Sequence, residues 1–445
     1  MILSWRTRRG SRGGDNKSSK ESLNSSLETE IMIPTHFRCP ISLDLMKDPV
    51  TLCTGITYDR ESIEKWIDSG NQTCPVTNQV LTSFEQIPNH SIRKMIQDWC
   101  VNNRSNGIER IPTPRVPVSP YEISEICSRI AVATRCGDYK RCLELVRKIK
   151  AWGKESERNK RCVVNNGTGC VLSNSFHCFA SVSIEKHVGL LGEMLSVLTW
   201  MSPIDEEGIS KLGSAVSLNC MVWVLNNGDL SARRNAVLVL KQLLSSDQRR
   251  VDTLVDIQGI CEALVNIIRE PICPKATKAS LTAIFYMISP SPTSVGFTSR
   301  FVELGLVSMI LEILVDAEKS ICERASGVLA YICDCKEGRE EAYKNALTMP
   351  LLVKKMLRIS EMATEFAVLT LWKLFKNAKR DEHEDVLVEA LQAGAFQKLL
   401  VLLQVGCGES IKEKATELLK LLNLQRDKLD CVDSSMDFKY LKRPF

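Results

Sequence analysis

The chain carries one helical pattern five times at a nearly constant spacing, and this repetition restricts its fold more than any other feature. Ala236, Leu240 and Leu243 would lie on one helix face, because residues three and four positions apart share a side of a helix. A small residue followed at the same spacing by two apolar residues returns at Ser280, Ile284 and Met287, at Ala325, Leu329 and Ile332, at Ala367, Leu371 and Leu374, and at Ala415, Leu419 and Leu422. The starting residues are 44, 45, 42 and 48 positions apart. Units of this length bury their apolar faces only by stacking on one another, so the pattern predicts a helical solenoid.

Glycines recur in phase with these helices. Gly259 and Gly305 each precede an apolar segment and are 46 residues apart, and Gly394 follows 89 residues later, about two periods. Ala346-Leu347 stands near the position that is skipped. A period of about 40–47 residues is typical of HEAT and armadillo repeats. A glycine that opens the long last helix of a unit favours armadillo.

We therefore predict an armadillo-repeat α-solenoid over residues 121–425. Its units should be regular at about 230–425, and two degenerate units should precede residue 230. In the latter, Gly167 or Gly169 would form a turn between helices. An irregular helical bundle is the alternative, which five matches in phase disfavour.

Charge is concentrated at the N-terminus. The net charge is +5, and residues 1–20 hold six basic residues against Asp15, so the remainder is balanced. A balanced body argues against nucleic-acid binding as the main function. We expect residues 1–30 to form a disordered basic tail. We also expect a cytoplasmic protein, with nuclear import or attachment to a membrane surface left open.

We expect no signal peptide, because the N-terminal segment lacks an apolar core of sufficient length, and no transmembrane helix, because no run of about 18 or more apolar residues occurs. The 18 cysteines should then be free thiols of a reducing compartment. Residues 31–104 form a compact block, and residues 105–120 are rich in proline and predict a linker or an extended wrap. Residues 426–445 lack periodicity and should form a tail.

Two Cys-Pro pairs, 35 residues apart, mark the N-terminal block: Cys39-Pro40 and Cys74-Pro75. Structural zinc would need closely spaced pairs of Cys or His ligands. The residue three positions after Cys39 is Ser42, and no two cysteines of the block have that spacing; only His36, three positions before Cys39, does, and one such pair is too few for a structural zinc site. Zinc is therefore disfavoured.

The block should be a small α+β domain. Residues 50–59 are rich in β-formers, with Gly55 at a turn. Residues 60–70 and 87–100 predict two helices, with Gly70 at the C-terminal end of the first and Asn89 as the N-cap of the second. The whole chain is thus predicted to be mainly α.

The block resembles the U-box, the metal-free relative of the RING domain. The resemblance rests on Phe37, Cys39, Pro40, Ile41, Met46, Asp48, Pro49, Val50, Gly55, Tyr58, Asp59, Arg60, Ile63, Trp66, Cys74, Pro75, Thr77, Leu81, Ile87, Pro88, Asn89 and Ile92. With the repeats behind it, the chain resembles the plant U-box ubiquitin ligases with armadillo repeats, in the short class with a basic tail directly before the U-box.

That resemblance implies that polar side chains, rather than a metal or other cofactor, brace the domain. It assigns structural roles to Cys39, Asp48, Pro49, Gly55, Tyr58, Asp59, Arg60, Cys74, Thr77, Pro88 and Asn89. Thr57, Glu61 and Asn78 are further candidates for the bracing bonds, whose pairing the sequence leaves open.

The resemblance also implies a partner surface. Pro40, Ile41, Trp66, Pro75 and Asn78 would contact a ubiquitin-conjugating enzyme. The bound enzyme would transfer ubiquitin directly to a substrate lysine, so no catalytic residue is expected on this chain. The partners implied are the conjugating enzyme, ubiquitin and a protein substrate in the armadillo groove, with self-association open.

The sequence leaves alternatives open at Trp66, at Asn78 and for the function as a whole. From spacing alone, Trp66 would be an ordinary core residue of an amphipathic helix. Some relatives carry Arg where this chain has Asn78, and an amide supplies no charge to the reactive complex. The alternatives are a non-catalytic armadillo scaffold, or a factor that elongates existing ubiquitin chains.

Overall fold

The structure, a computed structural model, describes residues 33–113, 117–247, 250–290, 294–378, 383 and 385–426. The chain separates into two units, residues 1–116 and 117–445. The predicted N-terminal tail, residues 1–30, lies outside the described residues, as do residues 427–445 of the predicted C-terminal tail.

The first unit contains a short antiparallel sheet. Strand β1 (Pro49–Thr51) lies between β2 (Thr57–Asp59) and β3 (Ile87–Pro88), and Val50 is paired with both Tyr58 and Pro88. Gly55 closes the turn between β1 and β2 at φ +80°, a left-handed conformation that glycine adopts without strain. The predicted hairpin is therefore present. Strand β3 was not predicted, because two residues are too few to show alternation.

Two helices complete this unit, together with the 3-10 turns η1 (Thr35–Phe37) and η2 (Arg104–Asn106). Helix α1 (Arg60–Asp68) is followed by Gly70 at φ +87°, and helix α2 (His90–Asn102) is capped by Asn89. The Asn89 side chain accepts a hydrogen bond from the Ile92 backbone N–H at 3.0 Å. Both predicted helix ends are confirmed.

The proline-rich segment is anchored at both of its ends. Ile111 is buried in the core of the first unit, and the Arg93 guanidinium donates a hydrogen bond to the Pro112 carbonyl at 2.8 Å. Val118 is buried in the core of the second unit, where its N–H donates to Asn159 Oδ1 at 3.0 Å. The first part of the segment is thus the extended wrap that the prolines suggested.

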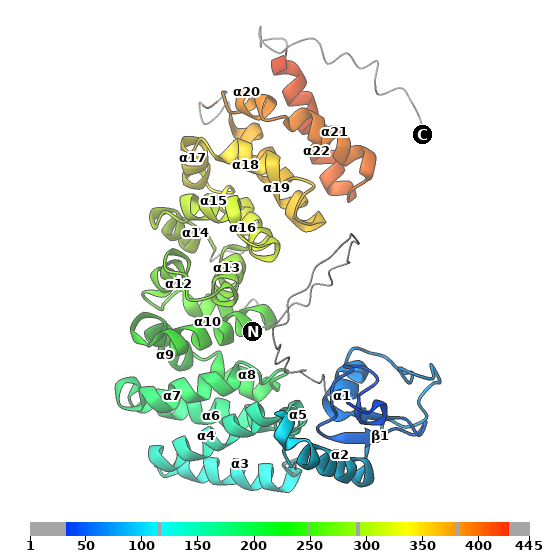
Figure 1. The fold of residues 1–445 in the computed structure, drawn as a ribbon. Coiled ribbons are helices and arrows are strands. Elements are labelled where there is room, and N and C mark those ends of the chain that lie inside the picture. The colour runs from blue at the N-terminus through cyan, green and yellow to red at the C-terminus, as the bar shows by residue number, and fades with distance from the viewer. Residues whose placement is uncertain are drawn as a thin grey trace, which may run out of the picture. The chain divides into compact units, whose positions relative to one another are not determined.

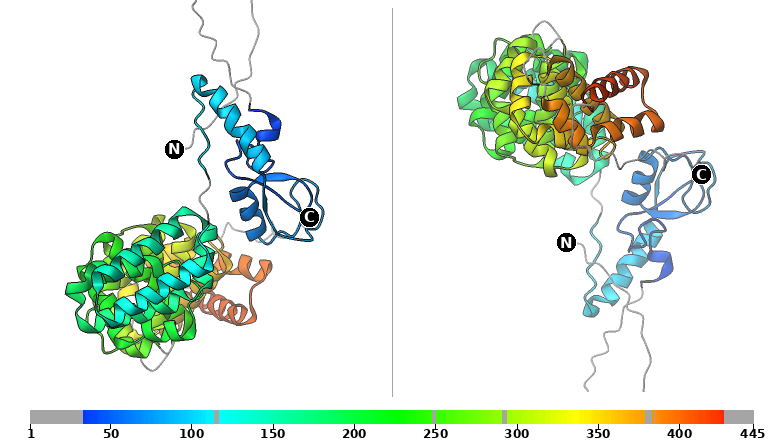
Figure 2. Two further views of the ribbon diagram at one scale, coloured as in Figure 1. Left: turned by 90° about the horizontal axis from the view of Figure 1, so that it is seen from below. Right: turned by 90° about the horizontal axis from the view of Figure 1, so that it is seen from above.

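The second unit is a stack of helices (Figure 1; end-on views in Figure 2). Its helices are α3 (Pro120–Arg135), α4 (Tyr139–Glu155), α5 (Glu157–Asn165), α6 (Thr168–Val182), α7 (Ile184–Leu198), α8 (Glu206–Leu212), α9 (Ala215–Asn227), α10 (Leu230–Ser246), α11 (Arg250–Leu254), α12 (Ile260–Arg269), α13 (Pro274–Ile288), α14 (Ser294–Glu303), α15 (Leu306–Asp316), α16 (Lys319–Ile332), α17 (Lys336–Lys344), α18 (Thr348–Lys355), α19 (Glu361–Ala378), α20 (Asp385–Gln392), α21 (Ala395–Val405) and α22 (Glu409–Arg426).

These helices fall into successive units of three, after a first unit that has only α3 and α4 in the described chain. The last helices of successive units pack on one another in the order α4, α7, α10, α13, α16, α19 and α22. The five predicted patterns all lie on members of this series, and their first residues are all buried. In α22 the second pattern residue, Leu419, is only half-buried, and its neighbour Leu418 takes the buried position.

Two details of the predicted repeat need correction. Gly259, Gly305 and Gly394 do not open the long last helices but the middle helices α12, α15 and α21, each with φ between +76° and +86°. Gly167 does the same for α6 at φ +70°, whereas Gly169 lies inside that helix. Before residue 230 the chain also holds more than the two predicted units, because α8 and α9 belong to the unit that α10 completes.

The repeat is visible in hydrogen bonds between neighbouring units. The guanidinium of Arg250 donates to the Ile209 carbonyl at 2.6 Å, and Lys398 Nζ donates to the Val353 carbonyl at 2.6 Å. The partners are 41 and 45 residues apart, close to one period. Lys398 also lies at the C-terminal end of α18, where the helix dipole favours a cation.

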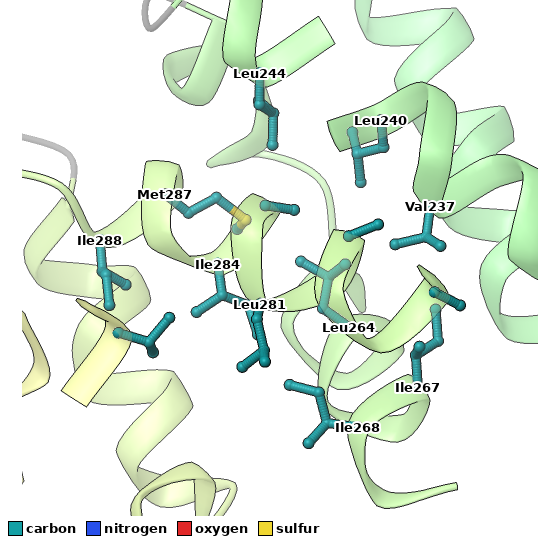
Figure 3. Packing of buried hydrophobic residues seen from close by; sticks show 14 of the residues in the cluster. Val237, Leu240, Leu244, Leu264, Ile267, Ile268, Leu281, Ile284, Met287 and Ile288 are labelled. Atoms are coloured by element: carbon teal, nitrogen blue, oxygen red, sulfur yellow. The ribbon is translucent and has the colours of Figure 1, made fainter. Parts of the chain in front are cut away.

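The core of the stack is apolar and tightly packed. Figure 3 shows Leu240 on α10, Leu264 on α12 and Ile284 on α13 pointing into a common interior, and all three are fully buried. Loss of one such leucine typically costs about 2–5 kcal/mol. No single described helix is long and apolar enough to cross a membrane; the bent pairs α8–α9 and α20–α21 pass that test only as pairs.

Candidate functional site

Two loops of the first unit, whose equivalent residues are 35 positions apart, share one pattern of backbone hydrogen bonds. In the first loop the Cys39 N–H donates to the Asp44 carbonyl, and the Leu43 N–H donates to the Cys39 carbonyl, both at 2.8 Å. In the second loop the equivalent bonds run from Cys74 to Gln79 at 2.8 Å and from Asn78 to Cys74 at 2.9 Å. The two Cys-Pro pairs are therefore equivalent positions of two similar turns.

Both turns contain a residue in the left-handed conformation. Leu43 has φ +61° and Asn78, its equivalent, has φ +55°. Asparagine tolerates this conformation well, whereas leucine is an uncommon residue there. The identity of Asn78 thus has a backbone reason that the sequence alone did not reveal. Leu43 has no such reason, and its side chain is 68% exposed.

The two cysteines tie the loops to strand β2. Cys39 Sγ accepts a hydrogen bond from the Asp59 N–H at 3.3 Å. Cys74 Sγ lies 3.0 Å from the buried Tyr58 hydroxyl, which also accepts from the Val76 N–H at 3.3 Å. Adjacent residues of one strand therefore hold both loops, where a RING domain would use metal ions.

A polar network braces the first loop against the helices. Asp48 forms an ion pair with Arg60 at 2.7 Å and a longer one with Arg93 at 3.6 Å. The Asp59 carboxylate accepts hydrogen bonds from the N–H groups of Lys47 and Asp48 at 2.8 and 2.9 Å. These partners come from β2, α1 and α2, so the network joins segments that are distant in sequence.

A second network joins the sheet to α2. The Asn89 amide donates to the hydroxyls of Thr51 and Thr57 at 3.1 and 3.2 Å, and these hydroxyls lie 2.9 Å apart. Two bracing candidates act only locally: Glu61 pairs with Lys65, and the Thr77 hydroxyl accepts from the Gln79 N–H within its own loop. Pro49 is buried, while Pro88 is exposed on β3.

The predicted partner surface lies on these two loops and α1. Ile41 and Trp66 pack against the same core cluster and stay half-exposed, and Pro75 is also half-exposed. The Trp66 indole N–H donates to the Thr73 carbonyl at 2.8 Å, which ties α1 to the second loop. Trp66 is therefore neither wholly core nor wholly surface. Pro40 and Asn78 are exposed beside these residues in the chain.

Two further apolar residues, which the sequence alone did not identify, extend this surface. Leu43 is 68% exposed and Val76 is 52% exposed, one on each loop. Single exposed apolar residues are common on protein surfaces, so sequence alone gives no signal for them. Their placement on both braced loops, next to Ile41 and Pro75, makes them candidates for the same partner. The apolar loop surface is therefore Ile41, Leu43, Trp66, Pro75 and Val76.

Neither cysteine of these loops is placed to carry a covalent intermediate. Burial raises the pKa of Cys74, but hydrogen bonds from Thr54, Thr77 and Tyr58 outweigh burial and lower this pKa to about 6. A thiolate is the better nucleophile. Cys74 and Cys39 are nonetheless fully buried, and an attacking thiol must be accessible. Within the described residues, no group of three or more Cys, His, Asp or Glu side chains could hold a metal ion.

Two loops braced by side chains alone, ahead of a helical stack, define the class of U-box proteins. A family model described as U-box domain matches residues 33–105, and one described as Plant U-box protein ARM repeat region matches residues 122–442. The chain therefore belongs to the plant U-box proteins with an armadillo-repeat region.

Relatives of full length support this assignment. U-box domain-containing protein 21 of Arabidopsis thaliana is 53% identical and covers 95% of each chain; U-box domain-containing protein 20 is 50% identical over 100% of each. E3 ubiquitin-protein ligase PUB22 of the same plant is 35% identical over 89% of this chain and 95% of its own. Among solved structures, a designed armadillo repeat protein is 20% identical, covers 57% of this chain and all of its own, and has a TM-score of 0.46.

Proposed function

We propose that the first unit of this chain docks a ubiquitin-charged conjugating enzyme on the apolar loop surface. The chain is a U-box-type ubiquitin-protein ligase whose armadillo repeats recruit the substrate. The observation that supports the docking proposal is the full or partial exposure of four apolar side chains on two equivalent hydrogen-bonded loops, together with Trp66 on α1. A few apolar anchors of this kind suit a protein interface of moderate size.

The chemistry needs no covalent step on this chain. The conjugating enzyme carries ubiquitin as a thioester, and the nitrogen of a substrate lysine attacks the thioester carbonyl. The lysine forms an amide bond, and the enzyme's cysteine leaves. The ligase contributes by holding both reactants together, which raises their effective concentration and orients them. Asn78 can donate or accept hydrogen bonds at the docked complex but adds no positive charge.

The decisive experiment is self-ubiquitylation with purified components and a broad panel of conjugating enzymes. Ile41→Ala, Leu43→Ala and Pro75→Ala should each lower the rate at least about tenfold, as expected of interface anchors. Val101→Ala is the matched control, because Val101 is 57% exposed on α2 and belongs to neither loop. A wild-type protein that is inert with every conjugating enzyme would contradict the proposal.

The same assay separates the alternatives. A non-catalytic scaffold would bind substrates yet leave charged conjugating enzymes unchanged. A chain-elongating factor would act on a substrate fused to ubiquitin and not on the unmodified substrate.

We further propose that the protein acts in the cytoplasm. A fluorescent fusion with and without residues 1–30 would reveal nuclear or membrane-surface targeting by the basic tail.

A further inference from the structure

A basic depression lies on the solenoid at the C-terminal ends of α16 and α19. It has a volume of about 470 Å³. Its walls carry four cations, Lys336, Arg339, Lys373 and Lys376, against one carboxylate, Asp334. Such an excess of one charge favours a ligand of the opposite sign.

The cations of the depression differ in whether a carboxylate of the chain already pairs with them. Lys373 is 8% exposed, pairs with Asp334 at 2.6 Å and donates to the Ala330 carbonyl at 2.7 Å. Lys336 and Lys376 are exposed, and neither forms an ion pair with any carboxylate in the described part of the chain. These two ammonium groups are therefore available to a partner.

Trp372 lies among these cations. Lys376 Nζ lies 4.3 Å from the centre of the Trp372 ring, and Lys414 Nζ lies 5.7 Å from it. The indole N–H donates to the Glu417 carboxylate at 2.5 Å, which fixes the ring between α19 and α22. Glu417 keeps its negative charge in this bond, so one carboxylate faces the two ammonium groups around the Trp372 ring.

Aromatic rings continue from the depression along the last helices of neighbouring units. Lys373 Nζ lies 5.5 Å from the Tyr331 ring, and that ring lies 5.0 Å from Phe285 on α13. Phe285 and Phe366 meet over Gly327, where an added Cβ would lie within 2.9 and 3.0 Å of their ring carbons. Glycine at this position of α16 lets the two rings, each half-exposed, form one apolar platform.

We propose that a basic-aromatic surface binds an acidic segment of the substrate protein that also carries bulky apolar side chains. This surface is formed by Lys336, Lys376 and Trp372 of the depression and by the rings of Tyr331, Phe285 and Phe366 beside it. The lysines would pair with the segment's carboxylates, and the platform would bury its apolar residues. The inference rests on the proposed role of the armadillo repeats in substrate recruitment. Helices α13, α16 and α19, which carry the aromatic rings, follow one another along one side of the stack (Figure 1), so an extended segment could cross several of them.

The test measures binding of the full-length protein to a short fluorescein-labelled peptide in which glutamates alternate with leucine and phenylalanine. Its counterpart carries glutamine in place of every glutamate. The double variant Lys336→Glu with Lys376→Glu should weaken binding of the acidic peptide roughly tenfold or more, and Trp372→Ala should weaken it severalfold. The matched control is Lys140→Glu with Lys186→Glu, which makes the same charge change at exposed lysines of α4 and α7, outside the basic-aromatic surface.

The control variant should bind the acidic peptide within about twofold of wild type, because screened charges outside the basic-aromatic surface act weakly. Self-ubiquitylation should be unchanged in every variant, which separates failure of this inference from failure of the ligase activity. Equal loss in the control, or equal binding of the glutamine peptide, would overturn the proposal. So would preference for a single-stranded oligonucleotide or an anionic lipid vesicle, either of which would identify another class of anion.

Discussion

The Tyr58 hydroxyl should control the second loop independently of the first. The substitution Tyr58→Phe keeps the buried ring and removes only the oxygen. The Val76 N–H then loses its acceptor at 3.3 Å, and Cys74 Sγ loses its neighbour at 3.0 Å. Within the described residues this hydroxyl makes no hydrogen bond to the first loop, where Cys39 Sγ accepts from the Asp59 backbone N–H instead.

The size of the effect follows from these two bonds. A neutral hydrogen bond contributes about 1 kcal/mol, and a bond to a thiol contributes less. We expect the free energy of opening of the second loop to fall by about 1–1.5 kcal/mol. A change of about 1.4 kcal/mol is tenfold in an equilibrium constant, so the open population should rise roughly tenfold.

Hydrogen exchange of the full-length protein measures this population. The amides of Asn78 and Leu81, which donate to the Cys74 and Gln72 carbonyls, should exchange up to about tenfold faster. The amide of Leu43 should keep its rate. Tyr121→Phe, at a tyrosine that is 78% exposed on α3, is the matched control. Equal acceleration in both loops, or none in the second, would refute the reasoning.

Three further outcomes are expected. Asp48→Asn should lower the free energy of unfolding of the first unit by about 1–2 kcal/mol in urea titration, since it weakens the ion pair with Arg60, while Glu61→Gln should cost less than about 0.5 kcal/mol because its pair is exposed. Ile111→Ala should cost about 2–4 kcal/mol, seen as a lower melting temperature, and an unchanged melting temperature would remove Ile111 from the core. Discharge of ubiquitin from a pre-charged conjugating enzyme should survive a strong zinc chelator, whereas its collapse would contradict a brace made of side chains.

Most of the fold could be predicted from the periodic features of the sequence. The five apolar patterns predicted the last helices of five units because a small residue and two apolar residues must face a neighbour at every period. The same reasoning failed by one position in α22, where Leu418 rather than Leu419 is buried. A last helix has no following unit in the described chain, so its apolar face is less strictly specified.

The site was predictable in kind but not in detail. Cys39 and Cys74 marked the two loops, yet nothing in the sequence shows that Asp48 pairs with Arg60 rather than another cation. Such pairs join residues far apart in the chain, and any of several would satisfy the same composition. The left-handed conformation of Leu43 could not be predicted from the sequence either, because leucine has no preference for it.

The spacing of the bonds between neighbouring units, 41 residues for Arg250 with Ile209 and 45 for Lys398 with Val353, has a consequence for how such a chain can change. Each unit depends only on the two units next to it. An ancestor could therefore have gained or lost one complete period and kept equivalent junctions on both sides, whereas a gain of half a period would have disrupted the junction at which it was inserted. Insertions and deletions in this solenoid should therefore comprise whole units. They would change the length of the substrate-recruiting surface without changing the U-box domain.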